Sequence, residues 1–477
     1  METTSRELET PSCQNKQSFH ILELPYDLVH VVFLLCWDQE DERLRHFPVV
    51  ASHVCRLWRQ YALENPNFWT SLTFETRLPE IDKYSTWLSR SKDVRFDLTI
   101  GSQPFEGASI KHAKNIMRLI IPHVQRMRSI RVKRVPPKIR QLIFDRLDEV
   151  NCPSLVTLLI EKESYIFATL AQSRWKFRPF AKGGAPQLKE IILRRIPNDY
   201  FIHQFGDLHL LEIQDRDLFG RSARDNAETV QRILSVLSKL QTLRINREFL
   251  PIGDGIPELT DMRAFQSTLP PITHHSLEEL SVIATQHDTN AIICSTILPS
   301  LRHLRRDIGS GLPVGACCLP ILAHQVPHHP FPNLLSLRLS GGHNPERPVD
   351  PVHSSHMAFL RGALAGLPHL EFLNLEQVDF DSNKHVTCLA RSCPRLKEIV
   401  LFCCSGFTLM ELCSVIRRRG EASDLDPLRY VCVEDPWSYR IRRLIEQAEE
   451  QGSEIISEFN TGISKTMADR IVLVDNK

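Results

Sequence analysis

The chain has 477 residues, of which 42% are hydrophobic and 24% charged, as in ordinary globular proteins. Its 58 basic and 57 acidic residues leave a net charge of +1, so overall charge does not indicate nucleic acid or a membrane surface as a partner. No apolar run reaches the roughly 18 residues of a membrane-spanning helix, and the polar start lacks the apolar region of a secretory signal. Thirteen scattered cysteines are typical of reduced core thiols. We therefore expect an intracellular protein, cytoplasmic or nuclear, with no membrane partner.

Residues 1–18 are a short polar lead-in, which we expect to be disordered. The apolar segment that follows begins with a predicted helix, Leu22–Leu35. Pro25 suits the first turn of a helix, because its missing N–H would have no partner there, and the negative charge of Asp27 is favoured at the same end. Apolar residues at helical spacing form one broad stripe: Leu28, Val31, Val32 and Leu35.

A second predicted helix, Val49–Ala62, is ended by Asn65 and Pro66, and a strand is predicted at Ser71–Phe74. One side of this helix carries Val50, Val54, Leu57 and Tyr61. A few short helices bury only a marginal core by themselves. The module therefore either docks against the next domain or uses an apolar stripe to bind a partner helix. The spacing alone leaves both interpretations of the stripe open.

A weak L-x-x-L-x-L repeat follows, with a mean spacing of about 30 residues. Its copies begin at Met127, Leu155, Leu188, Leu208, Leu240, Leu277, Leu301, Leu334, Leu370, Leu396 and Leu428, and the copy at Leu301 is damaged by Arg306. A proline stands two residues ahead of six copies: Pro153, Pro186, Pro299, Pro332, Pro368 and Pro394. Proline at that position closes a preceding helix and leads into an extended strand.

Alternate apolar residues of each predicted strand point into a shared core, and helix-like stretches lie between the strands at 227–237, 357–365 and 407–418. Repeated strand, turn and helix units predict a solenoid, because no single unit buries its own apolar face. A doubly wound nucleotide-binding sheet is the alternative, but its Gly-rich turn is missing. We expect residues 437–450 to form an amphipathic cap helix and 451–477 to add a last short strand or remain loose.

The stretch from Ala108 to Phe144 contains ten basic residues and no acidic one. Its plain interpretation is a solvated helix and strand edge. The sharper alternatives are a docking patch for an acidic or phosphorylated substrate and, more weakly, a nucleic-acid-binding surface, because aromatic residues that would stack on bases are missing. Two proline- and glycine-rich interruptions of the repeat, 309–332 and 341–353, are either binding loops or tolerated surface loops.

No constellation of catalytic or metal-binding residues stands out. His324 and His328 have the spacing of a zinc-ligand pair, but Pro327 lies between them and no C-x-x-C completes the site. The phosphate-binding glycine loops, the G-x-S-x-G elbow and H-E-x-x-H are all missing. A cysteine with a histidine partner remains possible by chance in a chain with 13 Cys and 20 His. We expect no catalytic residue, no cofactor and no metal.

The segment LPYDLVHVVF, followed by VCRLWRQYALENPNFWTSL, resembles an F-box. The matching residues are Leu24, Pro25, Asp27, Leu28, Val29, Val32, Phe33, Val54, Cys55, Trp58, Arg59, Ala62, Pro66 and Trp69. The chain further resembles fungal F-box proteins with degenerate leucine-rich repeats over most of its length, and this resemblance is specific over about residues 20–100. The asparagine that usually follows the motif in such repeats is missing, and only Cys404 occupies its position.

The resemblance implies an α/β chain: a short three-helix F-box at 19–70, an irregular leucine-rich-repeat solenoid at 71–436 with parallel strands on the concave face and helices outside, and the cap and tail at 437–477. F-box proteins are substrate receptors of SCF (Skp–cullin–F-box) ubiquitin ligases. The expected partners are thus the Skp adaptor, cullin through that adaptor, and an unknown protein substrate. The resemblance assigns adaptor contact to Leu24, Pro25, Leu28, Val32, Val54 and Trp58. Repeat geometry suggests Arg338, Asn374 and Lys397 for the substrate. A scaffold outside ubiquitination and a nucleic-acid-binding solenoid remain the alternatives.

Overall fold

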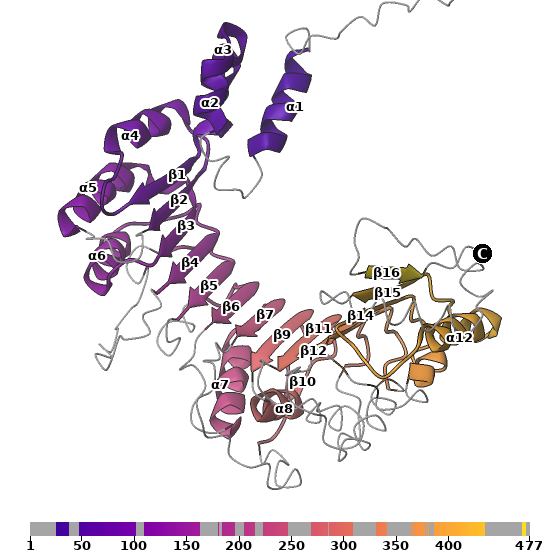
Figure 1. Cartoon of the computed structure of the whole chain (residues 1–477). Helices are drawn as coiled ribbons and strands as arrows, with labels where there is room; N and C mark the ends of the chain where they lie inside the picture. The colour runs from indigo at the N-terminus through magenta and orange to yellow at the C-terminus, as the bar shows by residue number, and fades with distance from the viewer. Residues whose placement is uncertain are drawn as a thin grey trace, which may run out of the picture. The chain divides into compact units, whose positions relative to one another are not determined.

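The computed structural model describes residues 25–37, 47–101, 109–162, 180, 184–195, 205–214, 223–246, 269–284, 286–308, 331–340, 364, 366–376, 378, 380, 386–434 and 470–473 (Figure 1). It divides into two compact units, residues 1–72 with 80–97 and residues 73–79 with 98–477. Several predictions lie outside the described residues: the lead-in, Leu24, the cap helix at 437–450, and nearly all of the helix at 357–365 and of the two proline-rich loops.

The first unit contains short helices: α1 (Tyr26–Trp37), α2 (Phe47–Val54), α3 (Arg56–Glu64), the 3-10 helix η3 (Pro66–Trp69) and α4 (Ile81–Arg90). The single helix predicted at Val49–Ala62 is wrong, because the backbone is extended at Cys55 and two helices meet there. The Cys55 thiol accepts a hydrogen bond from the Trp58 backbone N–H at 3.4 Å and so caps the start of α3. The helix boundary therefore depends on a side-chain cap.

Phe33 forms the centre of the aromatic core of this unit. Its ring packs against those of Phe47, Trp58 and Phe68, with centroid separations of 5.2, 5.0 and 5.7 Å. Trp69 is buried nearby, and its indole N–H donates to the Ala62 carbonyl at 2.8 Å. Each such buried aromatic ring contributes on the order of 1.5–3 kcal/mol. These contacts hold α1, α3 and η3 together.

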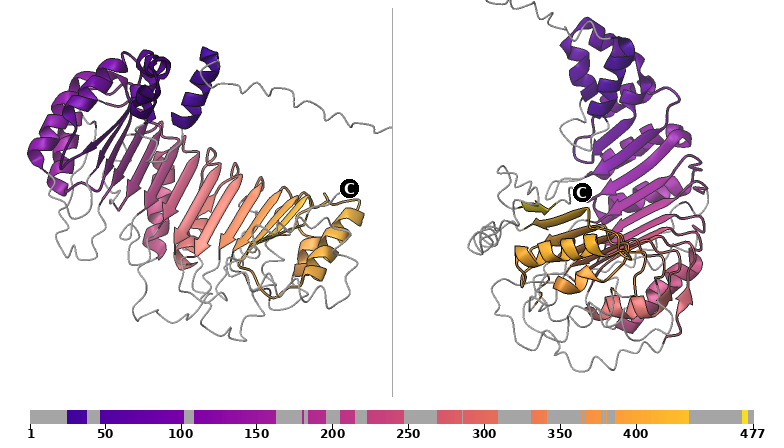
Figure 2. Two further views of the ribbon diagram at one scale, coloured as in Figure 1. Left: turned by 45° about the horizontal axis from the view of Figure 1, so that its top comes forward. Right: turned by 90° about the vertical axis from the view of Figure 1, so that its right-hand side faces the viewer.

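The described residues beyond position 70 form one main sheet of fourteen strands, and its strand order follows the sequence (Figure 2). Every neighbouring pair from β3 to β15 is parallel, whereas β16 is antiparallel to β15. Its strands are β1 (Ser71–Glu75), β2 (Phe96–Gly101), β3 (Met127–Lys133), β4 (Thr157–Glu161), β5 (Glu190–Arg194), β6 (Leu210–Gln214), β7 (Thr242–Asn246), β9 (Glu279–Ala284), β11 (His303–Ile308), β12 (Ser336–Ser340), β13 (Phe372–Glu376), β14 (Glu398–Phe402), β15 (Tyr430–Glu434) and β16 (Arg470–Leu473). A second, two-stranded sheet pairs β8 (Ile272–Thr273) with β10 (Thr296–Ile297).

The predicted repeat is confirmed, because each of its eleven copies forms one parallel strand from β3 to β15. Equivalent leucines lie in register: Leu211 pairs with Leu243, which pairs with Leu280. A recurring turn precedes the strands, in which the first leucine donates its backbone N–H to the residue three positions before it, as Leu334 does to Phe331 at 3.4 Å. The result is a mixed α/β architecture compatible with an α/β solenoid.

Helices accompany the sheet between strands, as the sequence predicted at 227–237 and 407–418. They are α5 (Ile110–Ile120), η4 (Ile121–Arg126), α6 (Pro137–Asp148), α7 (Ala223–Val236), α8 (Gln286–Cys294), η9 (Thr387–Ala390) and α12 (Leu409–Glu421). The side chains of Thr408 and Glu411 form a reciprocal capping box at the start of α12. A hydrogen bond of 2.6 Å from the Asn226 amide to Asp288 joins α7 to α8.

The turns after the strands use unusual residues instead of an asparagine ladder. Arg134 and Cys403 adopt positive φ angles of 57° and 52° directly after their strands, and their N–H groups donate to Glu161 and Glu434, the last residues of the next strands, at 2.8 and 2.7 Å. The Cys404 thiol donates to the Leu375 carbonyl of the preceding repeat at 3.2 Å. At this turn a thiol therefore links successive repeats.

Candidate interaction surfaces

The apolar stripe of α1 lies at the surface. Leu28, Val31, Val32 and Leu35 are 51, 49, 39 and 65% exposed. Val29 and Phe33, on the opposite side of the helix, are almost completely buried. The helix therefore uses its aromatic side to hold the unit together and presents an aliphatic side to its surroundings.

The other predicted adaptor-contact residues fall into two groups. Pro25 is exposed at the start of α1, and Val54 is exposed on α2 together with Val50. Trp58 is half-buried, and its ring packs on Phe33 with an interplanar angle of 72°. Trp58 therefore holds α1 to α3, whereas Leu28, Val32 and Val54 are accessible to a partner. Val31, Leu35 and Val50 also belong to the exposed apolar surface, although they were not among the predicted adaptor contacts. Their helical spacing in the sequence could have identified them.

Every second residue of a parallel strand faces away from the leucine core, and the register aligns these residues in rows; we call this side of the sheet the open face. Charged side chains of alternating sign form one chain of ion pairs on the segment from the end of β3 to β9: Arg134, Glu161, Arg194, Glu212, Arg244 and Glu279. The closest contacts join Arg134 to Glu161 at 2.9 Å and Arg244 to Glu279 at 3.0 Å. The hydrogen bond to Glu279 raises the pKa of Arg244 above its ordinary value. These charges satisfy one another within the protein.

Two of the predicted substrate residues are neighbours on the open face. Arg338 on β12 is the register partner of Asn374 on β13, and Arg305 on β11 continues the same row. Arg338 also forms an ion pair with Glu376. Lys397 lies outside this row, ahead of β14, where its ammonium group pairs with Glu371 at 2.9 Å. Arg305 was not among the predicted substrate residues, although it occupies the same position in the damaged copy as Arg338 does in its own copy.

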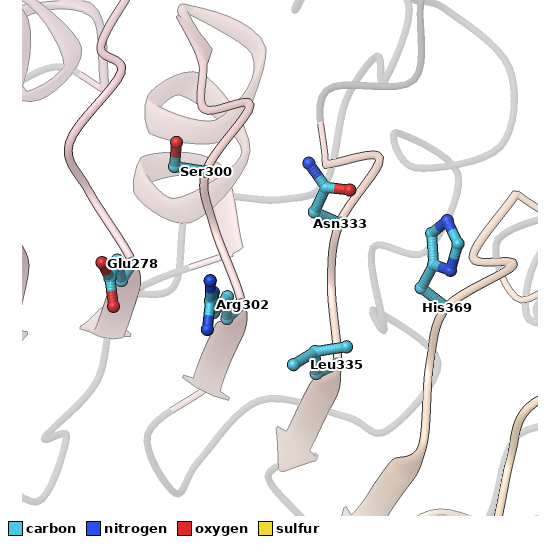
Figure 3. A pocket seen from close by; sticks show the side chains of 6 residues that line it. All are labelled: Glu278, Ser300, Arg302, Asn333, Leu335 and His369. Atoms are coloured by element: carbon cyan, nitrogen blue, oxygen red, sulfur yellow. The ribbon is translucent and has the colours of Figure 1, made fainter.

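A pocket of about 520 Å³ lies at the edge where strands β9, β11, β12 and β13 begin (Figure 3). It is lined by Glu278, Ser300, Arg302, Asn333, Leu335 and His369. The Asn333 amide nitrogen donates to the Pro299 carbonyl at 2.9 Å, so its oxygen points toward the side of His369. Ser300, Asn333 and His369 each stand between the proline and the first leucine of their copies. The prolines thus mark a polar edge at the start of the strands that carry Arg305, Arg338 and Asn374.

The cysteines of the described core have the properties of structural thiols. Burial raises the pKa of Cys152, Cys294 and Cys413 to about 11 each and that of Cys393 to about 12. This direction is opposite to that of an activated nucleophile, whose thiolate must form near neutral pH. Within the described residues, no group of three or more His, Cys, Asp or Glu side chains is arranged to hold a metal ion. His324 and His328 lie outside them.

The raised pKa values of these thiols predict that the folded protein loses stability in alkali. Thiols of the unfolded chain ionise near pH 9, whereas the folded thiols stay protonated up to about pH 11. The unfolded state therefore binds fewer protons above pH 9, and the free energy of unfolding falls as the pH rises from 9 to 11. We expect a loss of at most about 1 kcal/mol per thiol at pH 10, measured by urea unfolding. Cys393→Ala should remove part of this pH dependence. An identical pH profile for that variant would show that the Cys393 thiol does not contribute to it.

The fold places the basic residues of the segment 108–144 in different environments. Arg134 is paired with Glu161, and Arg140 is buried on α6, where burial lowers its pKa to about 10. Lys111, Lys114 and Arg118 instead lie exposed along α5. The ten basic residues therefore do not form one continuous surface.

Neither a protein-family model nor a curated protein matches this chain. Among the helices of the described residues, none combines the length and the apolar character needed to cross a bilayer. The assignment of function therefore rests on the residues and surfaces described above.

Proposed function

We propose that this chain is the substrate-recognition subunit of an SCF ubiquitin ligase: an F-box formed by α1 to α3 binds the Skp adaptor, and an irregular leucine-rich-repeat solenoid binds a protein substrate. The observation that carries the proposal is the aliphatic stripe of α1, exposed on one side while its aromatic side is buried. Exposed aliphatic stripes are costly to leave in water and are typical of helix-binding surfaces. Two residues of this stripe, Leu28 and Val32, are also among those that carry the F-box resemblance.

The open face supports the substrate half of the proposal, and its two parts differ. From β3 to β9 its charges pair with one another from strand to strand. From β11 to β13 the arginines are also paired, Arg305 with Asp307 and Arg338 with Glu376, but a polar pocket lies at the edge where these strands begin. Substrate contact is therefore assigned to this second part.

The proposed mechanism is proximity, and no residue of this chain makes or breaks a covalent bond. Two non-covalent sites on one chain raise the effective concentration of substrate lysines near the charged conjugating enzyme. The first test is co-expression of the full chain with the Skp adaptor and a cullin, followed by size-exclusion chromatography. A stoichiometric ternary complex is expected. Absence of adaptor from the peak of a folded chain would overturn the F-box proposal.

A scaffold that binds the adaptor outside ubiquitination is distinguished by its effect on bound proteins. For a ligase receptor, proteins that associate with the chain should become more abundant when cullin activity is inhibited. For a scaffold, their abundance should not change.

A prediction for the substrate surface follows from the row on β11 and β12. Charge reversal by Arg305→Glu together with Arg338→Glu should reduce substrate association at least tenfold, because like charges and a lost guanidinium donor each cost on the order of 1–3 kcal/mol. Proximity labelling of the wild type against the variant measures the loss. The control reverses two exposed basic residues elsewhere, Arg224→Glu on α7 and Arg146→Glu on α6. Equal labelling by variant and wild type would place the substrate elsewhere.

A further inference from the structure

Helix α5 presents a basic stripe that the adaptor and substrate surfaces do not use. Lys111, Lys114 and Arg118 follow one another at helical spacing and are all exposed. Lys138, also exposed, is the second residue of α6, which packs beside α5 (Figure 1). Within the described residues, no carboxylate forms an ion pair with any of these four side chains, and the nearest polar contact of Arg118 is the Asn115 amide at 3.4 Å. We call these four residues the α5 stripe.

This stripe is electrostatically unfavourable for the helices that carry it. Neither α5 nor α6 has an acidic residue in its first turn, and each has a lysine there instead, at the positive end of the helix dipole. Lys111 and Lys114, and Lys114 and Arg118, are also like charges at three- and four-residue spacing, which repel. Packing does not require them, because the core side of α5 consists of Ala113, Ile116, Met117 and Ile120. Core packing therefore does not account for these basic residues, and they are available to a partner.

The kind of partner follows from the extent and composition of the stripe. The net charge of the chain is only +1, so the attraction is local rather than the broad basic field of a nucleic-acid-binding protein. No Phe, Tyr or Trp stands on α5 or η4 to stack on bases, and the neighbouring apolar residue is Ile110, 43% exposed. Lys111 to Arg118 spans roughly 10 Å at the helical rise, a distance that an extended peptide covers with about three residues.

We propose that the α5 stripe binds a short acidic segment, rich in Asp and Glu, of a partner protein. Carboxylates spaced along an extended chain would contact Lys111, Lys114 and Arg118 in turn, with Lys138 of the adjacent α6 as a further cation and Ile110 as an apolar contact. This inference does not depend on the proposed ligase function, since it uses none of the residues of α1, α2 or the open face.

The test uses the full chain and three fluorescent probes: a synthetic peptide of alternating Asp and Glu, a DNA duplex, and vesicles containing phosphatidylserine. The variant is the triple charge reversal Lys111→Glu/Lys114→Glu/Arg118→Glu. A matched control makes the same charge change at exposed, already paired residues, Arg146→Glu/Arg224→Glu/Lys239→Glu. Thermal unfolding establishes that both variants are folded, and the stripe variant should be no less stable than the wild type.

We expect the acidic peptide to bind the wild type with an affinity that falls as salt is raised, to bind the stripe variant at least tenfold more weakly, and to bind the control within about twofold of the wild type. Binding of the DNA or the vesicles in preference to the peptide would overturn the proposal in favour of those partners. Equal weakening in the control, or no binding of the peptide, would also overturn it. Adaptor binding by the stripe variant should be unchanged, which separates this inference from the ligase proposal.

Discussion

The double substitution Leu28→Asp/Val32→Asp is expected to abolish binding of the Skp adaptor, weakening it at least 100-fold. The two side chains are 51 and 39% exposed, so both are available for burial by a partner. Their burial is expected to contribute about 1.5 kcal/mol or more each, and tenfold in affinity corresponds to about 1.4 kcal/mol. Aspartate adds the cost of an unpaired charge in an apolar interface. Isothermal titration calorimetry with purified adaptor measures the change.

The matched control for this experiment is Leu78→Asp. Leu78 is 71% exposed, lies between β1 and α4 in the sequence, and is not part of the stripe of α1. It makes the same chemical change on an exposed leucine, and adaptor binding should persist. Because Val29 and Phe33 form the buried side of α1, neither substitution removes core contacts. A double variant that is folded and still binds the adaptor at wild-type strength would show that this stripe is not the docking surface.

The second large effect is expected at Arg419 of α12, which is completely buried. Its guanidinium has no described carboxylate partner and donates to backbone carbonyls instead, those of Leu389, Ser392, Cys393, Pro394, Leu396 and Asp426. These carbonyls belong to η9, to the turn ahead of β14 and to the loop after α12. One side chain therefore holds three chain segments around the last repeats. Burial lowers the pKa of Arg419, but a guanidinium remains charged at neutral pH.

Arg419→Met is expected to lower the free energy of unfolding by about 3–5 kcal/mol, because several buried carbonyls lose their donor at once. Denaturant unfolding followed by circular dichroism measures it. Arg418→Met, one residue earlier and exposed, is the control, and should change stability by less than about 0.5 kcal/mol. Arg419→Lys should recover only part of the loss, because an ammonium group cannot reach carbonyls on both sides as a planar guanidinium does. Equal stability of Arg419→Met and the wild type would contradict this role.

The sequence predicted the strands well because the repeat carries two independent signals. Apolar alternation marks the strand, and the proline two residues ahead marks where it begins, as Pro332 does for Leu337 and Leu339 on β12. The break at Cys55 was missed, since the residues on both sides favour helix equally and the thiol cap depends on local geometry. Arg419 was missed because three arginines stand in a row at 417–419, and only the helical phase turns the last one inward.

The candidate surfaces were also predicted only in part from the sequence. Helical spacing identified the stripe of Leu28 and Val32 but did not reveal that it is exposed. Arg338 and Asn374 lie side by side in register because both follow the second leucine of their copies. Lys397 follows the first leucine instead, and the residue that shares the row of Asn374 is Val400. The ion-pair chain from Arg134 to Glu279 was not predicted, because its members are separated by whole repeats in the sequence.

The antiparallel pairing of β16 with β15 has a consequence for how the repeat array can change in length. A parallel repeat offers each new copy an identical edge, so copies added or lost between β3 and β15 leave the register of the others intact. β16 does not reproduce that register, and it covers the backbone donors and acceptors of β15 that would otherwise pair with another chain. Duplication or loss of copies is therefore expected upstream of β15, whereas the β15–β16 pair should stay as a unit in any longer or shorter version of this protein.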